Sequence, residues 1–231
     1  MDVRTGVQVN GLVRGDESGG YRVLTSAGPV RADAVVLAVP ALVAGSVCRS
    51  LDPGLSERLA QLPVTSSVSV SLGFRGGDLI GLPARQGFVV PASDGRRMRA
   101  CVVSSRKYPG RAPEGHVLMR VVLDAAREDE LTALDDVELV RIARDELASV
   151  LGLRAEPVLA RVHRWLESMP SYTVGYLDQV AASREQLDAF PGVTVAGSGY
   201  DGAGVPECIA FAHRAVDSVL AAAPTTSGPN R

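Results

Sequence analysis

The sequence predicts an α/β fold that is interrupted along the chain by an inserted α+β part. Three observations lead to this prediction. The almost wholly apolar residues 34–39 are typical of a strand in the middle layer of an α/β fold. Several strand-like runs and an amphipathic helix follow before residue 162. A short apolar strand, a glycine-rich loop and a second amphipathic helix then occupy residues 193–220.

These observations divide the chain into four predicted segments. Residues 1–40 begin the α/β part, and residues 41–162 form the inserted α+β domain. Residues 163–223 return to the α/β part. The tail 224–231, rich in small and polar residues, is predicted to fray.

The first segment predicts a hairpin followed by a buried strand. Two runs of alternating apolar and polar residues flank "GDESGG", which is a turn signal. Ala34 to Val39 then form a nearly continuous apolar run that ends at Pro40. This pattern predicts a strand covered on both faces.

The inserted segment predicts strands that precede one long helix. Ser56 is expected to cap a short helix, and Val64 to Phe74 alternate as in a half-covered strand. Three more strand-like runs follow: "QGFVVP", "RMRACVVSS" and "GHVLMRVVLDA". The next helix starts near Asp135 or Asp136 and closes at Gly152. Its apolar stripe is predicted to hold Val137, Leu139, Val140, Ala143, Leu147, Val150 and Leu151.

The returning segment carries the strongest functional signal. Val193 to Ala196 predict a buried strand, Gly197 to Gly204 a compliant loop, and Pro206 suits the first position of a helix. The helix is predicted to face the core with Ile209, Ala212, Val216, Val219 and Leu220. Free amides after Pro206, on Glu207 and Cys208, favour a ligand that carries or develops negative charge. Alternatively, Glu207 itself caps this helix.

Composition and motif spacing argue against several classes of protein. A net charge of −2, spread along the chain, does not favour nucleic-acid binding. No apolar run reaches the ~20 residues of a membrane span, although peripheral membrane contact stays open. Three scattered cysteines and no leader-like start predict a cytoplasmic protein, and no cluster has the spacing of a metal site. Phosphate-loop and nucleophile-elbow motifs are missing, and "GSG" alone is not a dinucleotide fingerprint.

Two stretches together resemble one enzyme family. "RWLESMPSYTVGYLDQV" and "PGVTVAGSGYDGAGVPECIAFAHRAVDSVL" resemble the carboxyl-terminal segment of bacterial porphyrinogen oxidases, which belong to the FAD-dependent amine oxidase superfamily. "RADAVVLAVPA" and "SSVSVSLGF" resemble the family more loosely. The chain departs from the family pattern at three positions, where Ser171 replaces Gln, Tyr176 replaces His and Glu207 replaces Asp.

The resemblance implies a cofactor, FAD, and a set of residues that hold it. Trp165 would lie near the flavin, while Gly204, Val205 and Pro206 would hold the isoalloxazine edge. The resemblance also implies that Gly197 lets the backbone approach the cofactor and that the main chain of Val9 contacts the adenine. No catalytic acid or base is assigned, because in such enzymes the cofactor performs the redox chemistry.

The resemblance further implies a Rossmann-like FAD-binding domain of amine-oxidase type, of which only part is present, with an inserted α+β substrate domain. The amino-terminal dinucleotide-binding half of the family has no counterpart in this sequence, so that half is an expected partner. The implied reaction removes hydride from coproporphyrinogen III or protoporphyrinogen IX, tetrapyrroles of heme biosynthesis, with O2 reoxidising the flavin.

Two alternatives stay open at this point. One is another flavin amine oxidase or desaturase-type oxidoreductase, and the other is a non-catalytic remnant that binds a partner or a nucleotide. The isolated chain is expected to retain little or no flavin, because the phosphate-cradling turn is missing.

Overall fold

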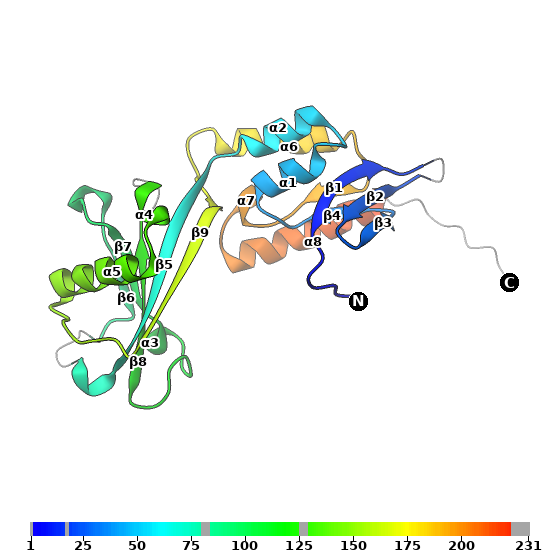
Figure 1. Ribbon diagram of the computed structural model, residues 1–231. Coiled ribbons are helices and arrows are strands. Elements are labelled where there is room, and N and C mark those ends of the chain that lie inside the picture. Colours follow the sequence, from blue (N-terminus) through cyan, green and yellow to red (C-terminus); the bar gives the residue numbers. More distant parts are fainter. Residues whose placement is uncertain (1, 17–18, 80–83, 125–128, 223–231) are drawn as a thin grey trace. The chain divides into compact units, whose positions relative to one another are not determined.

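The computed structural model describes residues 2–16, 19–79, 84–124 and 129–222. The predicted fraying tail, residues 224–231, lies outside these described residues. The chain folds as two compact units: unit 1 contains Met1–Val64 and Met169–Arg231, and unit 2 contains Thr65–Ser168 (Figure 1). The sequence predicted the boundaries after residues 40 and 162. The compact units divide instead after Val64 and after Ser168. The first boundary lies later than residue 40 because two helices, within residues 41–60, pack into the core of unit 1.

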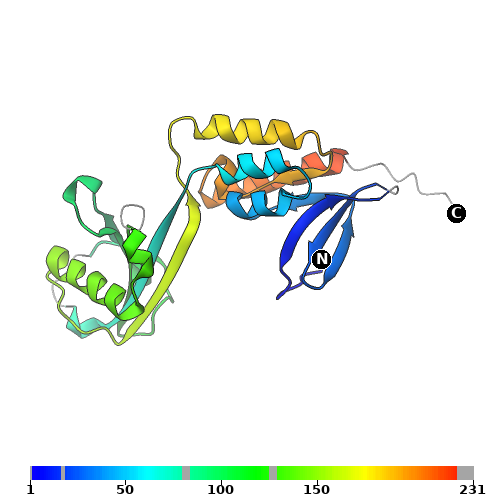
Figure 2. The same cartoon turned by 45° about the horizontal axis from the view of Figure 1, so that its top comes forward.

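Unit 1 contains two small sheets. Strands β1 (Val9–Arg14), β2 (Tyr21–Thr25) and β3 (Gly28–Ala32) form an antiparallel sheet in that order (Figure 2). This arrangement confirms the hairpin predicted around "GDESGG". Strands β4 (Val35–Leu37) and β10 (Val193–Val195) form a parallel pair.

Strand β4 is less covered than its composition predicted. Leu37 is buried, but Val36 remains exposed, so the prediction of a strand covered on both faces was wrong. The physical reason is that, within the described residues, α8 is the helix that packs substantially on β4, so one face of the strand has little cover. A short apolar run indicates capacity for burial, whereas burial itself requires elements on both faces.

The helices of unit 1 pack around these strands. They are α1 (Ala41–Cys48), α2 (Pro53–Ala60), α6 (Tyr176–Leu187), α7 (Ser198–Asp201) and α8 (Val205–Ala222). Helix α1 contacts β1 and α2, and α6 contacts α2 and β10, while α8 contacts β4 and β10. Helix α2 begins at Asp52, whose side chain accepts a hydrogen bond from the Leu55 amide. The expected cap, Ser56, is instead a buried residue inside the helix, because the apolar pattern alone did not locate its first turn.

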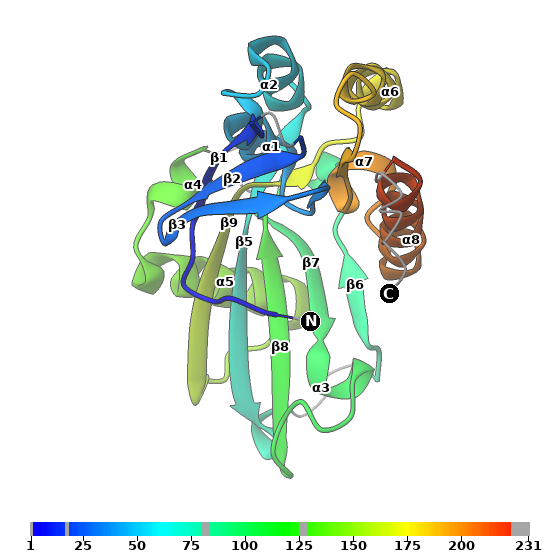
Figure 3. The same cartoon turned by 90° about the vertical axis from the view of Figure 1, so that its right-hand side faces the viewer.

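Unit 2 is a five-stranded sheet with a long helix on one face (Figure 3). The strands are β5 (Val64–Arg75), β6 (Gly87–Val89), β7 (Met98–Val103), β8 (His116–Leu123) and β9 (Leu159–Pro170), in the order β6-β7-β8-β5-β9. The four strands predicted from alternation, β5 to β8, are therefore confirmed. Short connections include η1 (Gly76–Asp78), η2 (Ala92–Asp94), α3 (Ser104–Lys107) and α4 (Asp129–Ala133).

Helix α5 (Asp136–Leu151) closes the core of unit 2. Asp135 caps its start by accepting a hydrogen bond from the Glu138 amide at 2.8 Å, and Gly152 ends it in the left-handed conformation. Both ends were predicted from sequence. The buried stripe holds Leu139, Ile142, Ala143 and Leu147, whereas Val137 and Val150 are exposed. The predicted stripe thus included two residues that face solvent, Val137 and Val150, and left out Ile142, which is buried.

Candidate functional site

The glycine-rich segment after β10 forms a short helix between two glycines. Gly197 precedes α7 with φ 124° and ψ 179°, and Gly202 follows it with φ 146°. Residues with a side chain rarely adopt these φ values, so both positions require glycine. A Cβ added to Gly197 would meet no atom within 4 Å. The main chain at Gly197 therefore borders open space, which a ligand could enter.

Three tyrosine side chains hold this segment in place. The hydroxyl groups of Tyr172 and Tyr176 donate hydrogen bonds to the carbonyl oxygens of Ser198 (2.6 Å) and Gly199 (2.5 Å). The Tyr200 hydroxyl donates to the Val39 carbonyl at 3.3 Å. The rings of Tyr172 and Tyr176 also meet edge to face, with centroids 5.1 Å apart. The loop predicted to be compliant is therefore braced.

The surroundings of Tyr176 and Tyr200 favour the neutral phenol, which is the form that donates. Burial raises the pKa of Tyr176, and the neighbouring Tyr172 raises it further. Burial also raises the pKa of Tyr200, with a smaller opposing influence from Arg184. Neutral phenols donate to carbonyl oxygens across the physiological pH range. The contacts of Tyr172 and Tyr176 with the glycine-rich loop were not predicted from the sequence.

Helix α8 starts one residue earlier than expected. Val205 is its first residue, Pro206 its second, and the Cys208 amide donates to the Gly204 carbonyl at 3.0 Å. The prediction of a free amide on Cys208 was therefore wrong, because that amide makes the first helical bond. Helix geometry leaves the Val205 and Glu207 amides in the first turn without intrahelical acceptors.

Glu207 folds back over the loop from which its helix starts. A Cβ on Gly204 would collide with the Glu207 carboxylate, and one on Gly202 would lie 3.4 Å from the Glu207 Cβ and Cγ. Glycine at 202 and 204 thus makes room for this side chain. A carboxylate near the first turn stabilises a helix. This position therefore agrees with the alternative prediction, in which Glu207 itself caps α8.

The other two predicted cofactor residues, Trp165 and Val9, lie on strands β9 and β1. Trp165 lies on β9 in unit 2 with 48% of its surface exposed, and its Nε1 donates to the Ser69 hydroxyl at 3.2 Å. Its ring lies against His163, with centroids 4.2 Å apart. Close by, Glu167 has an unusual φ of 45°, and its amide donates to the Ser66 hydroxyl at 2.9 Å. Val9 begins β1 in unit 1 and pairs with Thr25.

Four of the six predicted cofactor residues therefore lie in one continuous segment, residues 197–206: Gly197, Gly204, Val205 and Pro206. Gly197 fits a flavin because its main chain is open to a ligand. The start of α8 projects partial positive charge, but the Glu207 carboxylate lies over Gly204 at this end of the helix. Over the described part of the chain, no three His, Cys, Asp or Glu side chains form a group that could hold a metal ion. Within the same residues, no helix is both long enough and apolar enough to cross a membrane.

Comparison with known proteins places this geometry in a family. The fold, with its strand, glycine-rich loop and helix, matches part of the amine-oxidase fold. The family profile of flavin-containing amine oxidoreductases matches residues 1–220. The chain belongs to this family.

Curated relatives narrow the similarity to porphyrinogen oxidases. The chain is 33% identical to coproporphyrinogen III oxidase of Bacillus subtilis over 190 residues, which are 82% of this chain and 40% of the relative. It is 38% identical to coproporphyrinogen III oxidase of Propionibacterium freudenreichii over 203 residues, 87% of this chain and 38% of the relative. The chain thus spans about 40% of the length of these relatives.

Solved structures agree on the fold. A crystal structure from Exiguobacterium, provisionally named a protoporphyrinogen oxidase, matches with a TM-score of 0.78 and 30% identity, covering 92% of this chain and 46% of that one. Reduced UDP-galactopyranose mutase matches with a TM-score of 0.72 at 16% identity, covering 95% of this chain and 48% of that one. At that identity the second match shows the fold alone.

Proposed function

We propose that this chain forms part of an FAD-dependent porphyrinogen oxidase that dehydrogenates coproporphyrinogen III or protoporphyrinogen IX and passes electrons to O2. The observation that carries the proposal is the braced glycine segment at the start of α8, in a chain 33–38% identical to coproporphyrinogen III oxidases. Tetrapyrroles are the substrates named for these relatives. Bound FAD would supply the hydride acceptor that O2 reoxidises.

The chain's own residues would position the cofactor. Gly197 would let the main chain approach FAD, while Gly204, Val205 and Pro206 would line its isoalloxazine edge. The first-turn amides of α8 would stabilise negative charge on a reduced flavin because they are fixed dipoles that need no reorganisation. We further propose that Trp165 lies near the flavin and that the main chain of Val9 contacts the adenine.

The tyrosines would keep this edge rigid. By donating to the carbonyl oxygens of Ser198 and Gly199, Tyr172 and Tyr176 fix the turn between Gly197 and Gly202. A fixed turn costs no ordering when a cofactor binds, which favours affinity. The role of Tyr176 is therefore one of positioning.

A further polypeptide segment is needed to complete this site. Helix α8 leaves an apolar stripe exposed, of which Ile209 is 55%, Val216 47% and Leu220 67% exposed. Apolar stripes of this kind mark interaction surfaces. We propose that the dinucleotide-binding half implied by the family resemblance packs on this stripe.

Reconstitution tests the proposal. The chain is purified alone and with the remaining part of the Propionibacterium relative, and each sample is incubated with FAD and desalted. We expect flavin absorbance in the combined sample and little in the isolated chain, because the family resemblance implies that the turn holding the pyrophosphate belongs to the other half of the oxidase. The combined sample should develop porphyrin fluorescence with coproporphyrinogen III or protoporphyrinogen IX. Oxidation of putrescine without any porphyrin formation would instead indicate an amine oxidase.

A matched pair of variants tests the glycine edge. Gly197→Ala should abolish flavin retention in the combined sample, because alanine is strained at φ 124°. Gly199→Ala, two residues later, is the control: an added Cβ would only touch the Ala41 amide nitrogen at 4.0 Å. Equal flavin retention by both variants would remove Gly197 from the proposed cofactor site.

A further inference from the structure

A cluster of basic side chains lies at one end of unit 2. After β7, helix α3 and the loop that follows it carry Arg106, Lys107 and Arg111, and residues 95–113 contain no Asp or Glu. The Arg106 guanidinium donates a hydrogen bond to the Arg85 carbonyl oxygen at 3.5 Å, so Arg85 lies beside α3. Arg85, Lys107 and Arg111 are exposed, and we call these three residues the basic tip.

The basic tip lies at the end of the sheet opposite to the one where the chain enters and leaves unit 2. Strand β5 begins at Val64 and β9 ends at Pro170, so both connections are at the same end. At the other end, the last residue of β5 pairs with the first residue of β8, and α3 packs against β8 (Figure 3). The Ser105 hydroxyl accepts a hydrogen bond from the Leu118 amide at 3.1 Å, which fixes α3 there.

The charges of the basic tip are not neutralised as those of its neighbours are. Arg99, on β7, forms an ion pair with Asp124 at 2.7 Å. None of the three cations of the tip forms an ion pair with a carboxylate of the described residues. Instead, the Lys107 Nζ and the Arg111 guanidinium lie 5.4 and 5.3 Å from the centroid of the Tyr108 ring. These contacts restrain the side chains without cancelling their charge.

The surface around the tip offers one aromatic ring and little other apolar area. Among residues 104–116, all of which the structure describes, Tyr108 is the one large exposed hydrophobic side chain, with 48% of its surface exposed. Protein partners are usually held by several buried aromatic or aliphatic anchors. Cations around a tyrosine instead suit an anionic lipid surface, because long basic side chains reach the phosphates while the ring lies at the interface.

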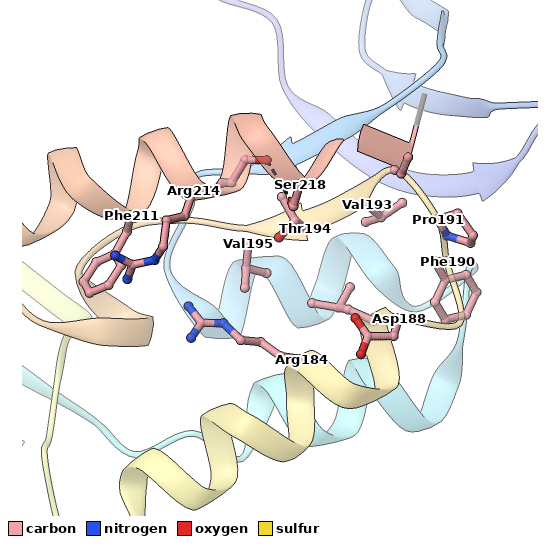
Figure 4. A pocket seen from close by; sticks show the side chains of 14 residues that line it. Arg184, Asp188, Phe190, Pro191, Val193, Thr194, Val195, Phe211, Arg214 and Ser218 are labelled. Carbon is pink, nitrogen blue, oxygen red and sulfur yellow. Dashed lines mark hydrogen bonds between the residues drawn. The ribbon is translucent and has the colours of Figure 1, made fainter. Parts of the chain in front are cut away.

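The basic side chains in unit 1 have different surroundings. A cavity of about 460 Å³ lies between α6, β10 and α8, and Figure 4 shows Arg184, Arg214 and Asp188 in its lining. Arg184 already has an interaction partner. The cavity runs along the edge of β10 that β4 does not pair with, where the remaining part of an FAD-binding sheet would pack. This cavity is therefore better explained by a further segment of the oxidase than by a ligand.

We propose that the basic tip docks unit 2 on a membrane surface that carries anionic phospholipids. Each basic side chain close to such a surface raises the binding constant about fivefold, so three give roughly a hundredfold preference over a neutral surface. The contact would be peripheral, since no helix in the described part of the chain is long and apolar enough to cross a membrane. The tip includes none of the residues proposed to hold FAD, so this proposal and the oxidase proposal can fail independently.

Sedimentation with lipid vesicles tests this contact in the 231-residue chain. Vesicles of phosphatidylcholine alone are compared with vesicles that contain about 30% phosphatidylglycerol, at low salt and at about 0.5 M salt. We expect the chain to bind the anionic vesicles at low salt, at least about tenfold more weakly at high salt, and the neutral vesicles hardly at all. No binding to the anionic vesicles, or equal binding to both kinds, would overturn the proposal.

Labelled poly-glutamate distinguishes a membrane from an acidic protein. It offers the same sign of charge as the anionic vesicles but gives Tyr108 no lipid interface. We therefore expect the vesicles to bind the chain more tightly than poly-glutamate does at equal concentrations of charge. Tighter binding of poly-glutamate, read from its fluorescence anisotropy, would overturn the proposal and indicate an acidic protein partner.

A matched pair of double variants locates the contact. Lys107→Gln with Arg111→Gln removes two charges from the tip and should weaken vesicle binding about twentyfold. Arg22→Gln with Arg49→Gln removes two charges from exposed positions of unit 1 and should change the binding less than about threefold. All four side chains are exposed, so both variants should keep the circular dichroism spectrum of the parent chain. Equal losses of binding would show attraction by net charge alone and would refute the tip as the docking site.

Arg85→Gln repeats the test outside α3 and its loop. This change should weaken vesicle binding about fivefold and should add to the loss in the Lys107→Gln, Arg111→Gln variant. Unchanged binding by Arg85→Gln would contradict a contact that includes all three cations.

Discussion

Helices α5 and α8 have similar sequence patterns and different surroundings. Each follows a loop and carries apolar residues at helical spacing. In α5, four apolar residues between Leu139 and Leu147 are buried against the sheet of unit 2. In α8, Ala215 is buried, while Ile209, Val216 and Leu220 are exposed. The prediction that these three residues face the core was therefore wrong for this chain.

The difference shows that an apolar stripe predicts burial of one face of a helix but does not identify the segment that covers this face. Helix α8 contacts β4 and β10, and Ala215 is buried on its inner face. The exposed apolar stripe of Ile209, Val216 and Leu220 lies on the opposite side of the helix. A helix with two apolar faces is suited to lie between two packed layers. In unit 1 the described residues provide one of those layers.

The reactivity of the cysteines should show the largest difference between the surroundings of α5 and those of α8. Burial raises the pKa of Cys101, in the sheet that α5 covers, to about 12. A raised pKa leaves the thiol protonated until the pH approaches that value, so at pH 8 the reactive thiolate is roughly a thousandfold scarcer than for a free cysteine. Cys208, in the first turn of α8, is only partly buried. We expect iodoacetamide at pH 8 to label Cys208 first, as read by peptide mass spectrometry.

The other buried thiol provides an internal control for this experiment. Burial raises the pKa of Cys48 to about 11, with Asp52 adding to the effect, so Cys48 should also stay unlabelled. All three cysteines should react in urea. Rapid labelling of Cys101 in the native chain would show that the core of unit 2 opens readily.

Leucine truncation should give the next largest effect. Leu139→Ala in α5 removes a fully buried side chain and should lower the free energy of unfolding by about 2–5 kcal/mol. Leu220→Ala in α8 removes an exposed one and should change it by less than about 0.5 kcal/mol. Urea unfolding followed by circular dichroism measures both. The fluorescence of Trp165, the single tryptophan, reports the transition of unit 2.

The result for Leu220→Ala tests whether the apolar stripe on α8 is exposed in the isolated chain. A loss as large as that of Leu139→Ala would mean that the stripe on α8 is already covered in the isolated chain. When the proposed dinucleotide-binding half is added, Leu220→Ala should become costly, because the side chain is then buried.

Helix caps should give the smallest effect. Asp135→Ala removes the side chain that accepts from the Glu138 amide, and should destabilise unit 2 by about 1 kcal/mol. Glu207→Gln removes a charge from the first turn of α8 and should cost about 0.3–1 kcal/mol. Thermal unfolding at low and high salt measures both. A Glu207→Gln effect that does not shrink in high salt would argue against a dipole interaction.

Much of the fold followed from local patterns. Alternation predicted β5 to β8, and Asp135 and Gly152 marked the ends of α5, because capping residues act on amides and carbonyls within one turn. The same reasoning misplaced the cap of α2 at Ser56, since Asp52, Ser56 and the adjacent apolar residues allow more than one starting point. Local signals therefore identified elements more reliably than their first residues.

The candidate site was only half visible in the sequence. The glycines at positions 197, 202 and 204 predicted an unusual backbone conformation. In the structure, Gly197 and Gly202 have φ values that require glycine. The tyrosine braces were not predicted, because Tyr200 reaches the Val39 carbonyl across 161 positions of the chain. The cavity with Arg184 and Arg214 likewise joins two helices that are separate in sequence.

The sequence by itself determined the strands β5 to β8, both ends of α5, where glycine is required, and which family the chain resembles, whereas β9, α1 and α6 were not predicted. The tertiary structure decided which face of α8 is buried and which carbonyl groups the tyrosines hold. The physical reason is the separation along the chain over which each kind of interaction acts. Backbone conformation and capping depend on neighbours within a few residues, whereas burial and side-chain contacts depend on which distant segments pack together.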